Sequence, residues 1–328
     1  MAEESTREWL PLVVQRRAAV ARDIVEFILV RADAGELPPF EPGAHVLVRT
    51  PAGSTRKYSL INPPEERLHY VIAVRRDANG RGGSVSMADG LASGAVIETS
   101  APESAFPLEC NARRYLFIAG GIGITPILGM IRHLQVRAAG GENPPPFQLI
   151  YLTRSVADTA YLEELTDQPI GARVGLHHDH GDPGEAFDLW PVLERPAAGT
   201  HIYCCGPRGL MDSVRDMTGH WPETSVHFES FGVGDAAMFE ANQAFTIHLA
   251  RSGESIEVDA DQTALEALKA HGCRVMSSCE AGSCGTCRMT YLSGDVEHRD
   301  LVLGEAEKAD QIMVCVSRAR GGFLELDL

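Results

Sequence analysis

The stretch "RYLFIAGGIGITPILGMIRHL", from Arg114 to Leu134, combines three local patterns in one run. Its first residues are apolar and suit a buried strand, three glycines within four positions permit a tight turn, and the rest has the spacing of an amphipathic helix. Downstream, "FQLIYLTRS", "HIYCCG" and "SVHFESF" alternate with helical stretches. Strands that alternate with helices predict βαβ units and a parallel sheet. We therefore predict an α/β domain at residues 109–231.

The sequence before this segment has a different pattern. Residues 1–108 contain short, β-branched runs such as "IVEFILVR", "HVLVRT" and "HYVIAVRR", separated by Pro and Gly clusters. Such runs are typical of an antiparallel barrel or sandwich. We predict about six strands here, forming an antiparallel β-barrel.

A third pattern follows residues 232–243, which are small and polar without periodicity and are predicted to be a linker. Residues 244–328 contain the strand-like "FTIHLARSGESIEV", the helical "QTALEALKAHG" and a cysteine-rich loop. An α+β domain is expected there. A chain of 328 residues is long enough for three domains of this size.

Composition narrows the class of protein. The formal net charge of −16 argues against a nucleic-acid binder, which needs clustered Lys and Arg to neutralise phosphates. The N-terminus lacks a basic segment followed by an apolar run, and no stretch approaches the roughly 20 apolar residues of a membrane helix. We expect a cytoplasmic protein without a membrane segment.

The cysteines are concentrated near the C-terminus and suggest a metal centre. Cys279, Cys284 and Cys287 have the spacing C-x4-C-x2-C, and Cys315 follows within the apolar run "IMVCVS", where we expect a strand. Four thiolates in this order match the plant-type [2Fe–2S] pattern, whereas structural zinc would more naturally use two separated C-x2-C pairs. Intervening glycines and small residues allow a tight loop around a cluster. These four cysteines are the predicted iron ligands.

Two glycine turns in the α/β domain are candidate anion sites. The first contains Gly120, Gly121 and Gly123 and precedes a helix that Thr125 could N-cap, with Pro126 at its first position. The second is "CCGPRG", from Cys204 to Gly209. The first turn lacks the dinucleotide fingerprint G-x-G-x-x-G, and glycines needed only for tight turning explain it equally well. Two such turns after neighbouring parallel strands would nevertheless flank the crevice where α/β sheets bind ligands.

Three further stretches carry polar chemistry with a plain structural alternative. "RKYSL" places Arg56 and Tyr58 on one strand face, suited to a phosphate and a flat ring, and Lys57 and Ser59 on the other. "GRGGS", Gly80 to Ser84, could form a phosphate-binding nest or only a flexible loop. "HHDHGD", His177 to Asp182, is more often a polar loop than a metal site, and as a functional site it suits the edge of a cofactor site better.

Six of these stretches occur in a fixed order: "RKYSL", "GRGGS", "GGIGITP", "CCGP", "HFESFG" and "CEAGSCGTC…C". In this order they resemble the phthalate dioxygenase reductase family, which includes the vanillate demethylase reductases. The resemblance covers essentially the whole chain. The order of domains matters, because related reductases place the ferredoxin first and bind FAD. The resemblance implies FMN, NADH and a [2Fe–2S] cluster as cofactors, with a β-grasp-like ferredoxin domain at the C-terminus.

The resemblance also implies roles for individual residues. It assigns FMN binding to Arg56, Tyr58, Ser59, Ala73, Val74, Gly82, Gly83, Ser84 and an aromatic shield, Phe228 or Phe231. It assigns NAD binding to Gly120, Gly121, Gly123, Thr125, Pro126, Cys205, Gly206 and Pro207. Cys204 beside Cys205 leaves open which sulfur faces the nicotinamide.

The function implied is a reductase that carries electrons from NADH to a separate terminal oxygenase, of Rieske type. Redox cofactors perform the chemistry, so no side chain need act as acid or base. Asp179 and Asp182 lie near the expected adenosine edge and favour NADH over NADPH, since they would repel a 2′-phosphate, whereas Arg154 and Arg208 argue mildly the other way.

Two alternatives and two further expectations remain. The alternatives are a reductase serving a cytochrome P450 or another acceptor, and a non-enzymatic iron–sulfur sensor with a degenerate reductase body. We expect a monomer. Residues 245–328 carry 14 Asp/Glu against 8 Lys/Arg, an acidic surface that could steer docking to a basic acceptor or could merely be solvated.

Overall fold

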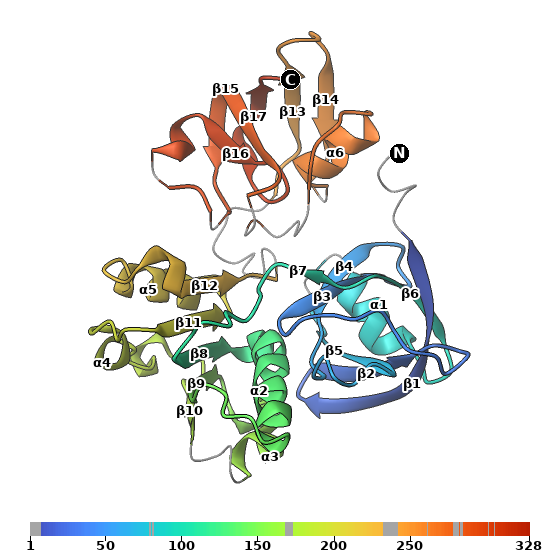
Figure 1. Cartoon of the computed structure of the whole chain (residues 1–328). Helices are drawn as coiled ribbons and strands as arrows, with labels where there is room; N and C mark the ends of the chain where they lie inside the picture. Colours follow the sequence, from blue (N-terminus) through green and yellow to red (C-terminus); the bar gives the residue numbers. More distant parts are fainter. Residues whose placement is uncertain are drawn as a thin grey trace. The chain divides into compact units, whose positions relative to one another are not determined.

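The computed structural model describes residues 8–328 except positions 79, 81, 168–172, 232–241, 261, 278–281, 283, 284, 301 and 305. Glu8–Glu229 forms one compact unit and Ser230–Leu328 belongs to a second. Figure 1 shows the elements of both units along the chain. Three separate sheets account for the strands of the described residues. The predicted fold class, a β-barrel, a parallel α/β sheet and an α+β ferredoxin, is confirmed, while the exact domain boundaries remain a prediction.

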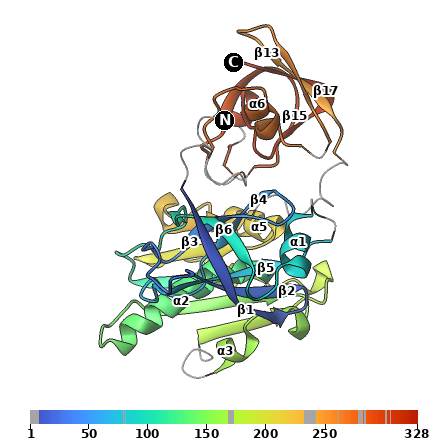
Figure 2. The ribbon, with the colours of Figure 1, turned by 90° about the vertical axis from the view of Figure 1, so that its right-hand side faces the viewer.

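The first sheet is antiparallel throughout and has the order β4-β3-β6-β1-β2-β5, with β7 paired to β3. Figure 2 shows β1 crossing this barrel-like sheet beside β2 and β6. Its interior is filled by alternate side chains such as Val14, Phe27, Val46 and Ile72, all fully buried. The strands are β1 (Trp9–Ala21), β2 (Ile24–Val30), β3 (Ala44–Arg49), β4 (Thr55–Ser59), β5 (His69–Arg75), β6 (Val96–Ser100) and β7 (Glu103–Ser104).

One helix interrupts this β module and was not expected. Helix α1 (Gly83–Gly90) is the next element after β5. Its composition, "GSVSMADG", has little intrinsic preference for a helix. It forms because Met87 and Ala88 bury their side chains in the barrel core, so that packing overrides propensity.

The second sheet is parallel, with the order β10-β9-β8-β11-β12. Helix α2 follows the glycine turn and lies between this sheet and the barrel (Figure 1). A Cβ added to Gly129 of α2 would come within 2.6 Å of the Leu60 carbonyl oxygen, which shows how closely the helix meets the barrel. The elements are β8 (Arg114–Gly120), the 3-10 turn η1 (Gly121–Gly123), α2 (Ile124–Ala139), β9 (Phe147–Thr153), α3 (Leu162–Thr166), β10 (Val174–His178), α4 (Trp190–Leu193), β11 (Thr200–Cys205), α5 (Arg208–Met217) and β12 (Val226–Glu229).

The third sheet, in the second unit, has the order β14-β13-β17-β15-β16. β13 and β17 are parallel and the other pairs are antiparallel. Helix α6 begins with a capping box, because Thr263 and Glu266 each bond the other's backbone N–H. The elements are β13 (Phe245–Leu249), β14 (Ser255–Val258), α6 (Ala264–Ala270), β15 (Arg288–Glu297), β16 (Gln311–Met313) and β17 (Arg318–Leu326).

Among the described residues, no helix has both the length and the apolar composition needed to cross a bilayer.

Candidate functional site

The two glycine turns lie against each other at the carboxyl ends of β8 and β11, which are adjacent parallel strands. A Cβ on Gly123 would lie 2.1 Å from the Cys205 carbonyl oxygen, and one on Gly206 would lie 3.0 Å from the Gly120 Cα. Only glycine permits such an approach of backbone to backbone. The predicted juxtaposition of the two turns is confirmed.

The predicted start of the helix after the first turn is wrong. Helix α2 begins at Ile124, with Gly123 at its N-cap and no side-chain cap, so Pro126 is the third helical residue. The chain winds directly from the 3-10 turn into the α-helix, and backbone groups therefore take the place of a cap. The Thr125 hydroxyl instead donates to the Ile122 carbonyl at 3.1 Å.

On the barrel side, the structure brings Arg56 of β4 to the N-terminus of α1. Gly82 caps this helix with φ of 82°, a left-handed conformation that glycine tolerates. A Cβ on Gly83 would lie 2.8 Å from the Ser54 Oγ and 3.1 Å from the Arg56 Nε. A helix N-terminus, a guanidinium and a glycine that leaves space between them form a cradle for an anionic group. These residues fit a phosphate.

The other residues assigned to the flavin differ in the groups that they could present to a ligand. Tyr58 lies two residues after Arg56 on β4, and burial raises the pKa of its hydroxyl to about 12. Val74 belongs to the barrel core, so only its backbone is available to a ligand, and Ala73 is likewise buried. The Ser84 Oγ accepts from the Asp77 N–H at 3.1 Å and thereby fixes the loop before α1.

A buried ion pair connects the barrel with the parallel sheet. The Lys57 Nζ lies 2.6 Å from the Glu229 Oε1, and the two side chains are 8% and 2% exposed. The Ser59 Oγ donates to the Glu229 Oε2 at 3.5 Å. Sequence reasoning placed Lys57 and Ser59 on one strand face but assigned no role to Lys57 or Glu229. The sequence did contain one signal for Glu229, because it is the acidic residue of "HFESF", one of the stretches on which the resemblance rests.

The two adjacent cysteines of β11 have different surroundings. Burial raises the pKa of both thiols. Glu229 raises the pKa of Cys205 further and Lys57 opposes it, whereas Arg215 of α5 acts on Cys204. Because side chains alternate along a strand, Cys205 is on the side of the ion pair and Cys204 on the side of α5.

The same alternation bears on the aromatic shield. Phe228 precedes Glu229 on β12, and the Arg215 guanidinium carbon lies 4.8 Å from the centre of its ring. Phe228 therefore packs with α5, on the opposite sheet face from Glu229. This packing argues against Phe228 as the shield. Phe231 belongs to the second unit, and its role stays a prediction.

Asp179 and Asp182 follow β10, the edge strand two positions from β8 in the sheet. Each stabilises its own loop. The Asp179 Oδ1 accepts from the Gly181 N–H at 2.9 Å, and the Asp182 Oδ1 accepts from the Gly184 N–H at 2.8 Å. Two strand spacings correspond to about 10 Å, so their loop lies farther along the same sheet edge than the glycine turns.

In the second unit, Cys287 and Cys315 are 2% and 3% exposed and belong to the same core. The Val314 N–H donates to the Cys287 carbonyl at 3.4 Å, which brings the two cysteine segments together. Cys315 lies in the turn after β16, so its predicted place within a strand is wrong. Two neighbouring thiols fit a soft metal cluster. Cys279 and Cys284, the other predicted ligands, lie outside the described residues.

Glycine shapes the described part of the cysteine loop. Gly282 has φ of +72°, and a Cβ there would approach the Val316 side chain to 2.7 Å and the Asp300 Cα to 3.1 Å. The Asp300 carboxylate accepts from the N–H groups of Val302 and Leu303 and so fixes the segment behind it. The prediction that this loop requires glycine is confirmed at Gly282.

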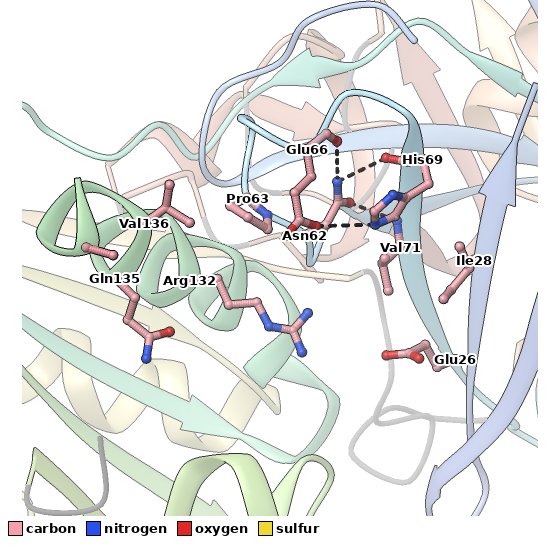
Figure 3. Close-up of a pocket in the computed structure, with 11 residues that line it drawn as sticks. Glu26, Ile28, Asn62, Pro63, Glu66, His69, Val71, Arg132, Gln135 and Val136 are labelled. Carbon is pink, nitrogen blue, oxygen red and sulfur yellow. Dashed lines mark hydrogen bonds and ion pairs between the residues drawn. The ribbon is translucent and has the colours of Figure 1, made fainter. Parts of the chain in front are cut away.

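A pocket of about 530 Å³ lies between α2 and the outer face of β2 and β5 (Figure 3). Two of its polar side chains, Asn62 and Arg132, already have partners. The Asn62 side chain bonds the Glu66 and His69 carbonyls and the Val71 N–H, and Arg132 bonds Glu164 and the Ile61 carbonyl. We therefore assign it no ligand.

Comparison with known proteins gives the site its context. Residues 247–320 match the 2Fe-2S iron-sulfur cluster binding domain family. The phthalate 4,5-dioxygenase oxygenase reductase subunit of Pseudomonas putida is 52% identical over 97% of this chain and 96% of its own length. The chain belongs to the phthalate dioxygenase reductase family. A solved phthalate dioxygenase reductase, described as a modular structure for electron transfer from pyridine nucleotides to [2Fe-2S], has 48% identity, covers 99% of both chains and superposes with a TM-score of 0.85.

This chain also resembles part of a larger enzyme. An intact type IV self-sufficient cytochrome P450 monooxygenase is 36% identical to this chain, over 98% of this chain and 41% of that one, with a TM-score of 0.67. The whole of this chain thus corresponds to less than half of the P450 protein. Family membership makes the chain an oxidoreductase and the reductase component of an oxygenase system.

Proposed function

We propose that this protein takes electrons from NADH through FMN to a [2Fe–2S] cluster and delivers them to a separate terminal oxygenase of the Rieske type. The proposal rests on one arrangement. A single compact unit contains both the Arg56 cradle of the barrel and the paired glycine turns of the parallel sheet. The ion pair of Lys57 and Glu229 connects the strand of the cradle with that sheet. The four predicted iron ligands, Cys279, Cys284, Cys287 and Cys315, follow later in the same chain, and we call their site the cysteine pocket. Family membership supports this order of cofactors.

The barrel residues suit the phosphate end of FMN. Arg56 and the N-terminus of α1 would hold the phosphate, Gly83 leaves it room, and Tyr58 offers a ring to the flavin. When bound, the flavin exchanges electrons in steps of one or two, which a hydride donor and an iron–sulfur cluster together require. The protein's contribution is to orient the nucleotide and exclude water.

The turns at Gly120–Gly123 and Cys205–Pro207 would hold the nicotinamide side of the nucleotide. Of the two cysteines, Cys205 is our candidate for the nicotinamide, because it lies on the side of Glu229 and Lys57. Its thiol stays protonated at neutral pH, since burial raises its pKa. Cys205 therefore offers a neutral contact and no nucleophile.

NADH is the proposed donor. Asp179 and Asp182 lie at the edge of the sheet where the adenosine would extend, and their carboxylates would repel a 2′-phosphate. Arg154 lies at the end of neighbouring strand β9, and its carbonyl accepts from the His180 N–H at 3.0 Å. A kcat/KM for NADPH equal to that for NADH would overturn this assignment.

A cytochrome P450 as acceptor is the second candidate, because a chain segment of the same length and fold occurs inside a self-sufficient P450. A non-enzymatic sensor is disfavoured by family membership and would be supported by absence of bound flavin. A monomer, and docking steered by the acidic surface of residues 245–328, remain part of the proposal. Docking that does not change with ionic strength would remove electrostatic steering.

The test is reconstitution with purified components. Holoprotein should show flavin absorbance, reduce cytochrome c with NADH, and support NADH- and substrate-dependent oxygen uptake with a Rieske oxygenase encoded beside it. Turnover with a P450 but with no Rieske oxygenase would move the assignment to the second candidate. Absence of flavin, or of NADH-dependent cytochrome c reduction, would refute the proposal as a whole.

A further inference from the structure

The buried pair of Lys57 and Glu229 is the feature that the proposed function does not yet use. Both side chains are nearly inaccessible, with Nζ and Oε1 2.6 Å apart. Removing two charges from water is unfavourable, and their mutual attraction only partly offsets this, so such a pair is a poor device for stability alone. Apolar residues of similar volume could join the two elements at least as well.

The pair lies beside the expected nicotinamide site. Glu229 is in register with Cys205 on the neighbouring strand, and Cys205 leads directly into the turn where Gly206 meets Gly120. Lys57 comes from β4, the strand that also carries Arg56 and Tyr58. The ammonium and carboxylate therefore connect the flavin strand with the end of the nucleotide sheet.

The charges around Glu229 balance. Within the part of the chain that the structure describes, the titratable groups against its carboxylate are Lys57 from β4 and Cys205 from β11, and the Ser59 hydroxyl adds a neutral donor. The Cys205 thiol is neutral, so one positive and one negative charge remain. The nicotinamide, by contrast, changes charge in the reaction: NADH loses a hydride, that is two electrons and one proton, to the flavin, and its neutral ring becomes a cation.

We propose that Lys57 is a positioning residue that holds Glu229 in place and neutralises it, so that the site does not favour the cationic nicotinamide of NAD⁺ over the neutral ring of NADH. Without Lys57, the carboxylate would stabilise the cation and retain the product. Without Glu229, the ammonium would repel the cation. This inference rests on the proposed function, because it takes the nicotinamide to lie at these turns.

The test compares the affinities of holoprotein variants for NAD⁺ and for tetrahydro-NADH, a neutral-ring analogue that cannot donate hydride. Lys57→Met should raise the ratio of NAD⁺ to analogue affinity by about tenfold, and Glu229→Gln should lower it by about tenfold, the effect that one unpaired buried charge beside the nicotinamide would have. The double variant, neutral again, should return close to the wild-type ratio. Lys57→Arg should keep that ratio.

A matched control separates local charge from overall charge. Arg137→Met also removes one positive charge and breaks a pair, with Glu142, but at an exposed site near the end of α2. Its ratio should equal that of the wild type. A merely structural pair would weaken both ligands equally in the single variants and leave every ratio unchanged, which would overturn the proposal. If Lys57→Met does not fold, Glu229→Gln and the double variant still decide it.

Failure of the proposed function would look different. In that case the wild-type holoprotein would bind neither ligand, and NADH would not reduce its flavin. Binding of both ligands by the wild type with unshifted ratios in the variants would contradict only the role of Lys57.

Discussion

Replacing Gly123 with alanine tests the contact between the two glycine turns. Gly123 has φ of −62°, so alanine introduces no backbone strain there. Its Cβ would nevertheless lie 2.1 Å from the Cys205 carbonyl oxygen and 2.4 Å from the carbonyl carbon, both backbone atoms of a paired strand. A normal contact needs more than 3 Å, so the two turns must separate by about 1 Å. Overpacking of this kind destabilises by about 3 kcal/mol, the upper part of the usual range, because no flexible side chain can give way.

Thermal unfolding and NAD⁺ titration of the holoprotein check this prediction. A loss of that size in a unit of this length should lower the melting temperature by roughly 6–12 °C. NAD⁺ affinity should fall as well, since the turns no longer meet. Gly209→Ala is the matched control, because its Cβ would enter open space within α5 and should stabilise by up to about 1 kcal/mol. If Gly123→Ala melts and binds like Gly209→Ala, the reasoning is refuted.

Two further predictions concern the cradle and a half-buried histidine. Gly83→Ala should lose flavin on desalting, because its Cβ would crowd Ser54 and Arg56. Gly90→Ala should retain flavin, because its Cβ would have no heavy atom within 4 Å. Equal flavin content in the two variants, measured by absorbance after denaturation, would contradict the cradle. Burial lowers the pKa of His227 to about 4, so the folded protein keeps it neutral while the unfolded chain binds a proton below about 6.5. The free energy of unfolding should therefore fall by about 1–2 kcal/mol between pH 6.5 and 4, allowing for partial exposure. His227→Asn should remove this loss. If the free energy of unfolding of wild type and variant depends on pH in the same way, the assignment to His227 is wrong.

Local patterns predicted much of this fold. The run of apolar residues, glycines and helical spacing from Arg114 to Leu134 encodes strand, turn and helix within a few residues of one another, and the structure has β8, η1 and α2 there. The helical spacing of "QTALEALKAHG" likewise lies within one short run, and the structure has α6 there. Such features depend on neighbours in sequence, which is why they could be inferred.

Features that depend on distant contacts were missed. Lys57 and Glu229 come from different sheets, and no local signal pairs them. Helix α1 forms through burial of Met87 and against its own propensity. The direction of Phe228 followed from strand alternation only once Glu229 was known to meet Lys57. Candidate site residues could thus be proposed from motifs, while their partners in the fold required the structure.

The central claim is that electrons leave the flavin through the cysteine pocket. Its most direct test mixes holoprotein anaerobically with NADH and cytochrome c and compares the wild type with Cys287→Ala. Cys287 is buried in the second unit, whereas the residues that we assign to the nucleotide and to the phosphate of FMN belong to the unit Glu8–Glu229. The exposed Cys110 supplies the control, Cys110→Ala. We expect NADH to reduce the flavin of Cys287→Ala at the wild-type rate, but this variant should pass almost no electrons to cytochrome c. Cys110→Ala should do both at the wild-type rate. Wild-type cytochrome c reduction by Cys287→Ala would contradict the claim.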